Sequence, residues 1–162
     1  MANENTNAFS TAGFKLKYAV EVTAGTRPTA GYTELGNIVS IGKVDNEPGT
    51  LDTTDLSETE YKQSIPGLKE AGNVAIKMNF TQAAVEKWNS LVSSSTNASG
   101  GRKMAWFEAV PPAASGYSKS FFFGGYPSKL GFPGADVDSV FQGDGNITIA
   151  KVEGWTEAST EA

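Results

Sequence analysis

The sequence predicts a mainly β fold, a β-sandwich or open barrel of about seven or eight strands, with one flanking α-helix at about residues 81–93. Three observations support this prediction. The chain of 162 residues contains 18 Gly and many Ser and Thr, but only 19% of its residues are charged, which favours strands and turns. Apolar and polar residues alternate with a period of two along several segments. Helical spacing is convincing in one place only.

The clearest strand signal lies at residues 14–22, where apolar residues occupy every second position. These residues are Phe14, Leu16, Tyr18, Val20 and Val22. We expect the face that they share to lie in the core. Residues 23–31 predict a loop, and residues 32–44 predict a second β stretch interrupted at Gly36 and Gly42.

A third strand and the helix follow one another directly. The strand is predicted from the alternation of Val74, Ile76, Met78 and Phe80. Thr81 is a suitable N-cap and begins a segment in which apolar residues recur with helical spacing. These residues are Ala84, Val85, Trp88, Leu91 and Val92. Ser- and Gly-rich residues 93–101 predict the end of the helix.

The C-terminal half predicts further strands. They are expected at about residues 102–110, 118–126 and 146–153. Asp144-Gly145 fits a two-residue turn, which predicts a β-hairpin joining residues 137–142 to residues 147–152. The run Phe121-Phe122-Phe123 cannot direct all its rings to one face of a strand, so the surplus ring is a weak indication of a subunit interface.

The most acidic part of the chain is residues 45–60. It contains six carboxylates and no Lys or Arg: Asp45, Glu47, Asp52, Asp55, Glu58 and Glu60. Pro48-Gly49 and isolated apolar residues predict a long loop at 46–70. Loops longer than about 12–15 residues in compact domains usually have a function. We therefore expect one domain, residues 1–162, with an extended N-terminal arm (1–12), this acidic loop and a short C-terminal tail (155–162).

Two residue types are absent, and their absence limits the chemistry. The chain has no His and no Cys, which removes the commonest general base, thiolate nucleophiles, disulfides and Cys-type metal sites. We expect no catalytic, metal or cofactor site and no enzyme. Asp136, Asp138 and Asp144 lack the spacing of a calcium loop. The acidic residues 45–60 fit a solvated or partner-facing loop better than the carboxylate pair of a glycosidase.

The net charge and the hydropathy of the chain also limit its possible partners. The net charge of −5 argues against nucleic-acid binding through phosphate neutralisation. The N-terminus has neither the basic start nor the apolar run of a signal peptide, and no segment is apolar enough for a transmembrane helix. We expect a soluble protein that is made in the cytoplasm and has no membrane partner.

Two short motifs carry a resemblance to a known family. The first reads Glu47-Pro48-Gly49-Thr50-Leu51-Asp52-Thr53-Thr54-Asp55, and the second, after Tyr61, reads Ile65-Pro66-Gly67-Leu68-Lys69-Glu70-Ala71-Gly72. With the strand that ends at Phe80 and the helix behind it, they resemble the tail tube proteins (major tail proteins) of long-tailed bacteriophages. The resemblance runs loosely from about Gly31 to Trp155.

The resemblance implies a structural virion protein in the phage tail. Such proteins assemble themselves into hexameric rings, and the rings stack into a hollow tube through which phage DNA passes without specific binding. The implied partners are further copies of the chain, and tail terminator, tape measure and tail-tip proteins. The expected interface residues are Glu47, Pro48, Asp52, Thr53, Thr54, Asp55, Tyr61, Ile65, Pro66 and Leu68. The N-terminal arm, the acidic loop and the C-terminal tail would make the contacts between rings.

A second interpretation belongs to a different class of protein. A β-sandwich binding module, either carbohydrate-binding or adhesin-like, would use exposed aromatic rings as stacking platforms. The candidate rings are Tyr117, Tyr126 and Trp155.

Overall fold

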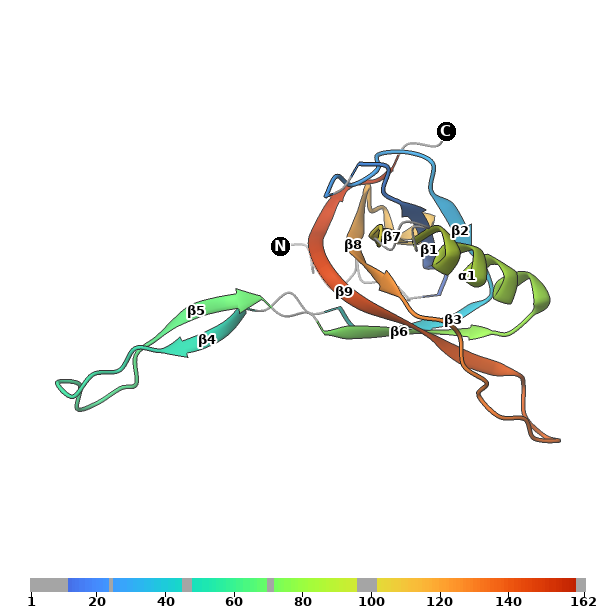
Figure 1. The fold of residues 1–162 in the computed structure, drawn as a ribbon. Coiled ribbons are helices and arrows are strands. Elements are labelled where there is room, and N and C mark those ends of the chain that lie inside the picture. Colours follow the sequence, from blue (N-terminus) through green and yellow to red (C-terminus); the bar gives the residue numbers. More distant parts are fainter. Residues whose placement is uncertain (1–11, 24, 45–47, 70–71, 96–101, 160–162) are drawn as a thin grey trace, which may run out of the picture.

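The computed structural model describes residues 12–23, 25–44, 48–69, 72–95 and 102–159 (Figure 1). In chain order the elements are β1 (Lys15–Val20), β2 (Thr33–Leu35), β3 (Ile38–Ile41), β4 (Pro48–Asp52), β5 (Ser64–Lys69), β6 (Asn73–Asn79), α1 (Gln82–Ser95), β7 (Ala105–Val110), the 3-10 turn η2 (Ala113–Ser115), β8 (Lys119–Pro127) and β9 (Gln142–Glu157). Most of the predicted N-terminal arm and the end of the predicted C-terminal tail lie outside the described residues.

One antiparallel sheet curls into an open barrel. Its seven strands have the order β2-β1-β7-β8-β9-β6-β3, so β2 and β3 are the two edges. These edge strands are consecutive in the chain and are separated only by Gly36 and Asn37. Three Cα-to-Cα steps reach at most about 11 Å, so the two edges must lie close together at this corner. The prediction of a mainly β open barrel with a single described helix is confirmed (Figure 1).

Helix α1 lies against the barrel and begins where the sequence predicts. Thr81 is its N-cap, because the Ala84 amide donates to Thr81 Oγ1 at 3.2 Å. Asn37 Nδ2 also donates to Thr81 Oγ1, at 3.1 Å, and so links the corner between β2 and β3 to the start of the helix. Trp88 and Leu91 are buried in the core.

The predicted alternation is confirmed along β6 and holds only in part along β1. Val74, Ile76 and Met78 are buried, and the residues between them are exposed. Leu16 of β1 is also fully buried. Val22, however, is 89% exposed, so its expected place in the core is wrong. The strand ends at Val20, and the chain leaves the sheet before Val22.

The predicted turn at Asp144-Gly145 is wrong. Both residues lie inside β9, where Asp144 pairs with Lys77 and Gly145 pairs with Ile76 of β6. A Cβ atom at position 145 would lie 2.6 Å from the Trp88 indole, so this glycine makes room for a buried ring. The strand predicted at residues 137–142 is also wrong, because residues 128–141 form an irregular protrusion between β8 and β9.

The surplus ring of the Phe run is covered by the chain itself, so its expected role as an interface is wrong. Phe123 belongs to the core cluster. Phe122 is fully buried as well, but outside that cluster. The Arg27 guanidinium lies 4.0 Å from the centroid of the Phe122 ring, and Tyr32 contacts the same ring edge-on. Burial in this small cluster raises the pKa of Tyr32 to about 12.

Two segments predicted as irregular contain regular structure. The loop expected at 46–70 holds β4 and β5, which form a separate two-stranded sheet. Residues 155–157 of the expected tail belong to β9. After the strand, Ser159 donates to the buried Glu108 carboxylate from its amide at 2.9 Å and from its hydroxyl at 2.7 Å.

Candidate assembly interface

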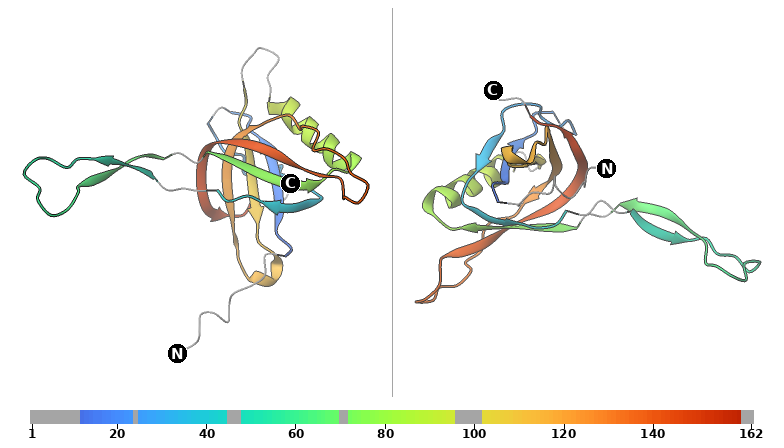
Figure 2. Two further views of the ribbon diagram at one scale, coloured as in Figure 1. Left: turned by 90° about the horizontal axis from the view of Figure 1, so that it is seen from below. Right: turned by 180° about the vertical axis from the view of Figure 1, so that it is seen from behind.

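The β4–β5 hairpin projects away from the barrel in every view (Figures 1 and 2). Its strands are antiparallel, with Leu51 opposite Ile65 and Asp52 opposite Ser64. A two-stranded hairpin that stands alone is at best marginally stable in water. A projecting hairpin of this kind is therefore suited to packing against a partner.

The tip of the hairpin is held by its own hydrogen bonds. The Gln63 amide donates to Thr54 Oγ1 at 2.7 Å, and Thr54 Oγ1 donates back to the Gln63 carbonyl at 3.1 Å. The Thr53 amide donates to the same carbonyl at 2.9 Å. Asp52 accepts from the Thr54 amide at 2.9 Å. This network presents the tip in one shape before any partner binds, which reduces the entropy lost on association.

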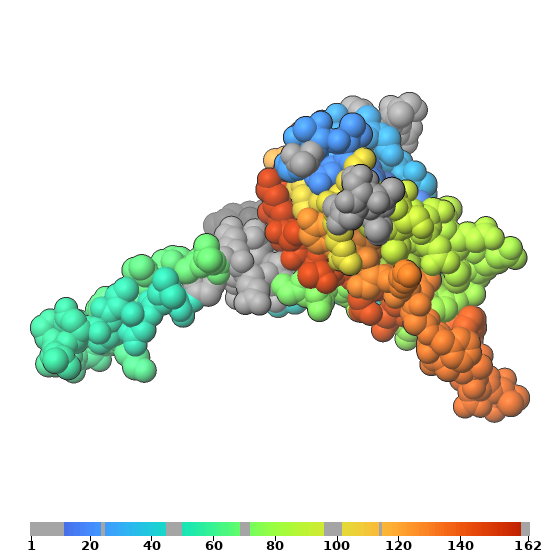
Figure 3. Space-filling model, viewed as in Figure 1, coloured from blue at the N-terminus to red at the C-terminus, as the bar shows by residue number. Residues whose placement is uncertain are grey.

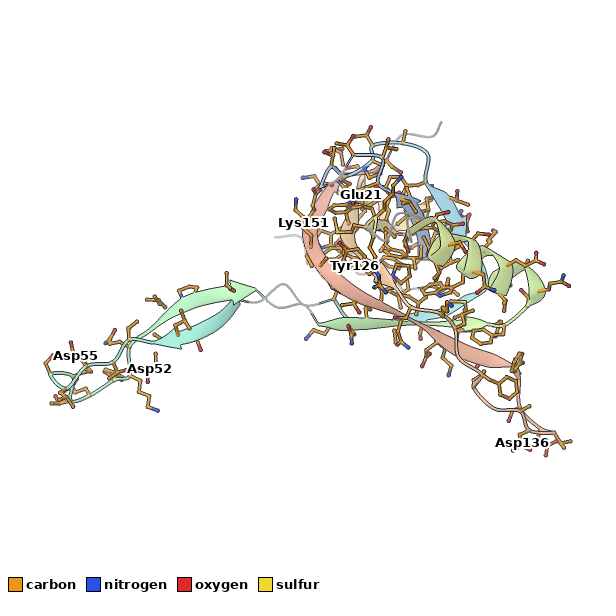
Figure 4. All side chains as sticks on the ribbon, viewed as in Figure 1. Glu21, Asp52, Asp55, Tyr126, Asp136 and Lys151 are labelled. Carbon is orange, nitrogen blue, oxygen red and sulfur yellow. The ribbon has the colours of Figure 1, made fainter. Side chains whose placement is uncertain are left out.

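The tip is also an ordered group of charges (Figure 4). Hydrogen bonds from the hydroxyl and amide of Thr54 lower the pKa of Asp52, and those from Ser57 lower the pKa of Asp55. Backbone amides two and three residues further along the chain lower the pKa of Glu58. All three carboxylates are therefore ionised at neutral pH and hold the backbone that surrounds them.

Apolar side chains are unusually exposed on this hairpin. Five large ones lie on it in contact with solvent: Leu51, Leu56, Tyr61, Ile65 and Leu68. Leu68 is 94% exposed, and the side chain of Leu56 is completely so. Grouped exposed apolar residues mark interaction surfaces in soluble proteins. The hairpin thus combines a hydrogen-bonded acidic tip with exposed apolar side chains both at the tip and along the two strands.

The interface residues predicted from the sequence fall on this one element, apart from one outside the described residues. Asp52, Thr53, Thr54, Asp55 and Tyr61 lie at or near the tip, while Pro48 lies in β4 and Ile65, Pro66 and Leu68 lie in β5. Glu47 lies outside the described residues. Sequence reasoning missed Leu56 and Gln63. The Gln63 contact with Thr54 joins residues nine positions apart, which only the hairpin register reveals.

A second group of exposed apolar side chains lies on residues 128–141, a protrusion that we call the second arm and that Figure 3 shows in orange. It leaves the barrel on the side opposite the hairpin (Figures 1 and 3). Its exposed large side chains are Phe132, Val137, Val140 and Phe141. The hairpin and the second arm together hold nine of the thirteen large apolar side chains that are exposed in the described residues. The glycines and prolines of this segment were the available signal that it is not a strand.

The seam of the open barrel contains an apolar cavity of about 700 Å³, which we call the seam cavity. It lies between edge strand β3 and the residues that precede β1. Phe14, Ile38, Val39, Ile41, Phe121 and Trp155 are among its lining residues. No local sequence pattern indicated this cavity, because its walls come from five segments that lie apart in the chain.

The other candidate sites find less support in the geometry. Tyr117 and Trp155 contact each other edge-on with centroids 5.7 Å apart. Tyr126 lies near the other end of β8, opposite Thr148, so the three rings do not form one sugar-binding platform. Within the part of the chain that the structure describes, no three metal-ligating side chains lie together. No described helix is long and apolar enough to cross a membrane.

The described residues form an open β-barrel with one α-helix and two projecting arms, and solved structures have a similar overall fold. The sequence matches no family model and no curated protein. A cryo-EM structure of the anti-feeding prophage cap (AFP tube terminating cap) matches with a TM-score of 0.62 and 14% identity over 93% of this chain and 92% of that chain.

Two further structures are similar over nearly their whole length. One is the sheath/tube terminator of an extracellular contractile injection system, PVC, in the extended state, with a TM-score of 0.61 and 13% identity over 90% of this chain and 94% of the other. The other belongs to the anti-feeding prophage (AFP) baseplate, with a TM-score of 0.60 and 8% identity over 99% of this chain and 100% of the other. At these identities the likeness establishes a shared fold.

Proposed function

We propose that this chain is a structural component of a phage-tail-like assembly and that it packs against copies of itself and against other tail proteins. The observation that carries the proposal is the β4–β5 hairpin, with its hydrogen-bonded tip and its solvent-exposed Leu56 and Leu68. The shared fold supports it, because the similar structures come from the cap, terminator and baseplate of contractile injection systems. Fold alone does not define function, so the chemistry of the hairpin is the stronger argument.

Within this class we propose a tail tube subunit. Six copies would form a ring through a heterologous contact, and rings would stack through the hairpin and the chain termini. Terminator, tape measure and tail-tip proteins would be its partners in the virion. The net charge of −5 per chain suits the wall of a DNA channel, because an acidic lumen repels phosphates and lets DNA slide without binding.

The tube terminator is a second candidate. Two of the similar structures are described as a tube-terminating cap and a sheath/tube terminator. A terminator would use the same fold and the same hairpin to bind one end of a tube, and it would not add further rings. The two candidates differ in whether the purified chain elongates.

Negative-stain electron microscopy of the purified full-length chain at rising concentration tests both candidates. Long hollow tubes are expected for a tube subunit, and single rings that never elongate would favour the terminator. The matched control replaces residues 50–66 with a short Gly-Ser linker and is expected to give a folded monomer. A full-length chain that stays monomeric at every concentration, even with tail ends added, would overturn the proposal.

A further inference from the structure

We propose that residues 155–159, which we call the C-terminal strap, form a lid that opens and closes on the barrel while the rest of the fold stays intact. In this proposal Glu108 is the residue that holds the lid closed. The inference does not depend on the proposed function, because it concerns contacts within one chain. It explains why the chain, after its last strand, turns back to a carboxylate in the interior of the sheet.

The order of the strands defines the path of the strap. Its first three residues end β9 and pair with the start of β8, where Thr156 lies opposite Ser120. Glu108 lies on β7, on the far side of β8. Ser159 nevertheless donates to the Glu108 carboxylate from its amide at 2.9 Å and from its hydroxyl at 2.7 Å. The strap therefore crosses β8 on the face that carries Ser120, and Ser120 is buried there.

The carboxylate of Glu108 binds the end of the strap specifically. Glu108 is 1% exposed, and a buried carboxylate is costly unless hydrogen bonds satisfy it. Lys17 lies opposite Glu108 across β1 and β7, but among the described residues it forms no ion pair with this carboxylate. Ser159 supplies the hydrogen bonds instead. Hydrogen bonds to an ionised acceptor are stronger than those between neutral groups, so they favour the closed strap.

A hinge joins the strap to the rest of β9. The pairing of β9 with β8 skips Glu153, which forms a β-bulge, and resumes at Gly154. Gly154 has a φ angle of 84°, a left-handed conformation that glycine adopts without a steric penalty. Arg27 forms an ion pair with Glu153 and fixes the chain on the barrel side of this hinge. The strap can therefore turn away while the sheet keeps its place.

The strap is held to the sheet from one side only. Strand β6 pairs with β9 over residues 142–148 and does not reach the strap. Two hydroxyl oxygens at the strap, Ser120 Oγ and Thr156 Oγ1, are buried without a hydrogen-bond partner in the described part of the chain. Opening hydrates both oxygens and offsets part of the cost of breaking the strand pairing. These features favour local opening of the strap before the sheet unfolds.

Opening of the strap changes the surface that the barrel presents. In the closed position the half-exposed Trp155 ring packs edge-on against Phe121 and Tyr117, with centroids 5.4 and 5.7 Å apart. Phe121 and Trp155 both line the seam cavity. Movement of the strap therefore removes one wall of the cavity and uncovers Phe121. The lid controls access to the apolar interior of the seam.

Thiol labelling tests the proposal, because the chain contains no Cys. S120C places a thiol under the strap without removing a hydrogen bond, since Ser120 Oγ has no partner in the described residues. V74C places a thiol in the core of the barrel, where Val74 is buried. The rate of reaction of the dilute protein with the disulfide reagent DTNB measures strap opening in the first variant and barrel unfolding in the second.

Each thiol variant is combined with changes at the end of the strap. S159A removes the hydroxyl bond to Glu108, and we expect it to raise the labelling rate of S120C about tenfold and to leave that of V74C unchanged. Loss of one hydrogen bond to a charged group shifts an opening equilibrium by about this factor or more. S159T keeps the hydroxyl and should retain the slow rate. A chain that ends at Glu157 lacks both donors and should label fastest at S120C.

Three outcomes would overturn the proposal. Equal acceleration at S120C and V74C would show that Ser159 stabilises the whole barrel and not a separate lid. Unchanged labelling of S120C in S159A and in the shortened chain would show that the strap does not cover Ser120. An S159T variant that labels as fast as S159A would show that the hydroxyl bond does not hold the strap. All three leave the proposed function intact, because electron microscopy measures assembly independently.

Discussion

The indole of Trp88 lies directly over Gly145, and this contact fixes how α1 packs on the barrel. A Cβ atom at position 145 would lie 2.6 Å from the indole ring. The ring cannot move away easily, because it is fully buried and its Nε1 donates to the Ser128 carbonyl at 2.8 Å. Helix, sheet and the start of the second arm therefore meet at a single tryptophan.

This contact predicts that G145A destabilises the barrel. Overpacking a rigid core site costs about 1–3 kcal/mol, and the methyl group has no space here. Urea unfolding monitored by Trp fluorescence measures the change. The matched control is G131A, because nothing lies within 4 Å of a Cβ at Gly131. Equal unfolding midpoints for the two variants would contradict the packing described for Trp88.

The run Phe121-Phe122-Phe123 illustrates which features of the fold could be predicted from the sequence and which could not. Alternation identified the core faces of β6, and the N-cap rule identified Thr81, because both depend on residues close in the chain. Phe122 lies under Arg27, a residue far away in the sequence, so local patterns gave no reason to expect it to be covered. Asp144-Gly145 had the residues of a turn, but the need for space beside Trp88 explains the glycine instead.

The sequence indicated which residues form the candidate interface, but it did not indicate that they form a β-hairpin. The acidic composition and the two short motifs directed the prediction to residues 46–70, where the structure has the β4–β5 hairpin. The hairpin register that brings Thr54 to Gln63 depends on pairing across the strands, which this irregular sequence does not specify. Residues 137–142, at the end of the second arm, were predicted as a strand because Asp144-Gly145 has the residues of a hairpin turn, and tertiary context overrides such a local signal.

Arg27 supplies the next prediction. Its guanidinium lies over the Phe122 ring, and its Nε is 2.5 Å from Glu153 Oε2. We expect R27A to lower the free energy of unfolding by about 1–2 kcal/mol, because the ring loses its cover and a cation–π contact. R102A is the matched control, since Arg102 lies 6.0 Å from the Tyr126 centroid and is exposed. Thermal unfolding should separate the two variants, and an R27A midpoint no lower than that of R102A would argue against this role.

The acidic tip predicts a pH dependence confined to the hairpin. Hydrogen bonds lower the pKa of Asp52 and of Asp55 below 3.8, and that of Glu58 below 4.5. A carboxyl with a lowered pKa stabilises the folded tip above its ordinary pKa, and this contribution is lost as the pH falls through the lowered value. Amide NMR signals of Thr54 and Ser57 should therefore hold constant from pH 7 to about pH 5 and shift only in stronger acid. Midpoints at or above the ordinary carboxyl values would contradict the network, and β8 amides serve as the internal reference.

Substitution of Leu68 tests whether this part of the hairpin serves assembly or the stability of the monomer. Its side chain is 94% exposed on β5, and it is absent from the core cluster and from the partly buried residues packed on that cluster. A solvent-exposed leucine that serves only the monomer can be replaced with little change, typically within about 0.5 kcal/mol. We therefore expect L68D to leave the thermal unfolding midpoint of the dilute protein unchanged. Sedimentation at high concentration should nevertheless show the loss of large assemblies, because a buried carboxylate at an apolar contact is costly.

V22D is the matched control for L68D, since Val22 is almost as exposed and lies outside both the hairpin and the second arm. It carries the same added charge, so any general effect of acidity on association appears in both variants. The hairpin role requires assembly to survive in V22D and to fail in L68D. If both variants assemble alike, the exposed apolar side chains along the hairpin strands are not part of the contact. If both fail alike, added negative charge prevents association wherever it is placed. Repulsion between these acidic chains, and not a specific surface, would then control assembly.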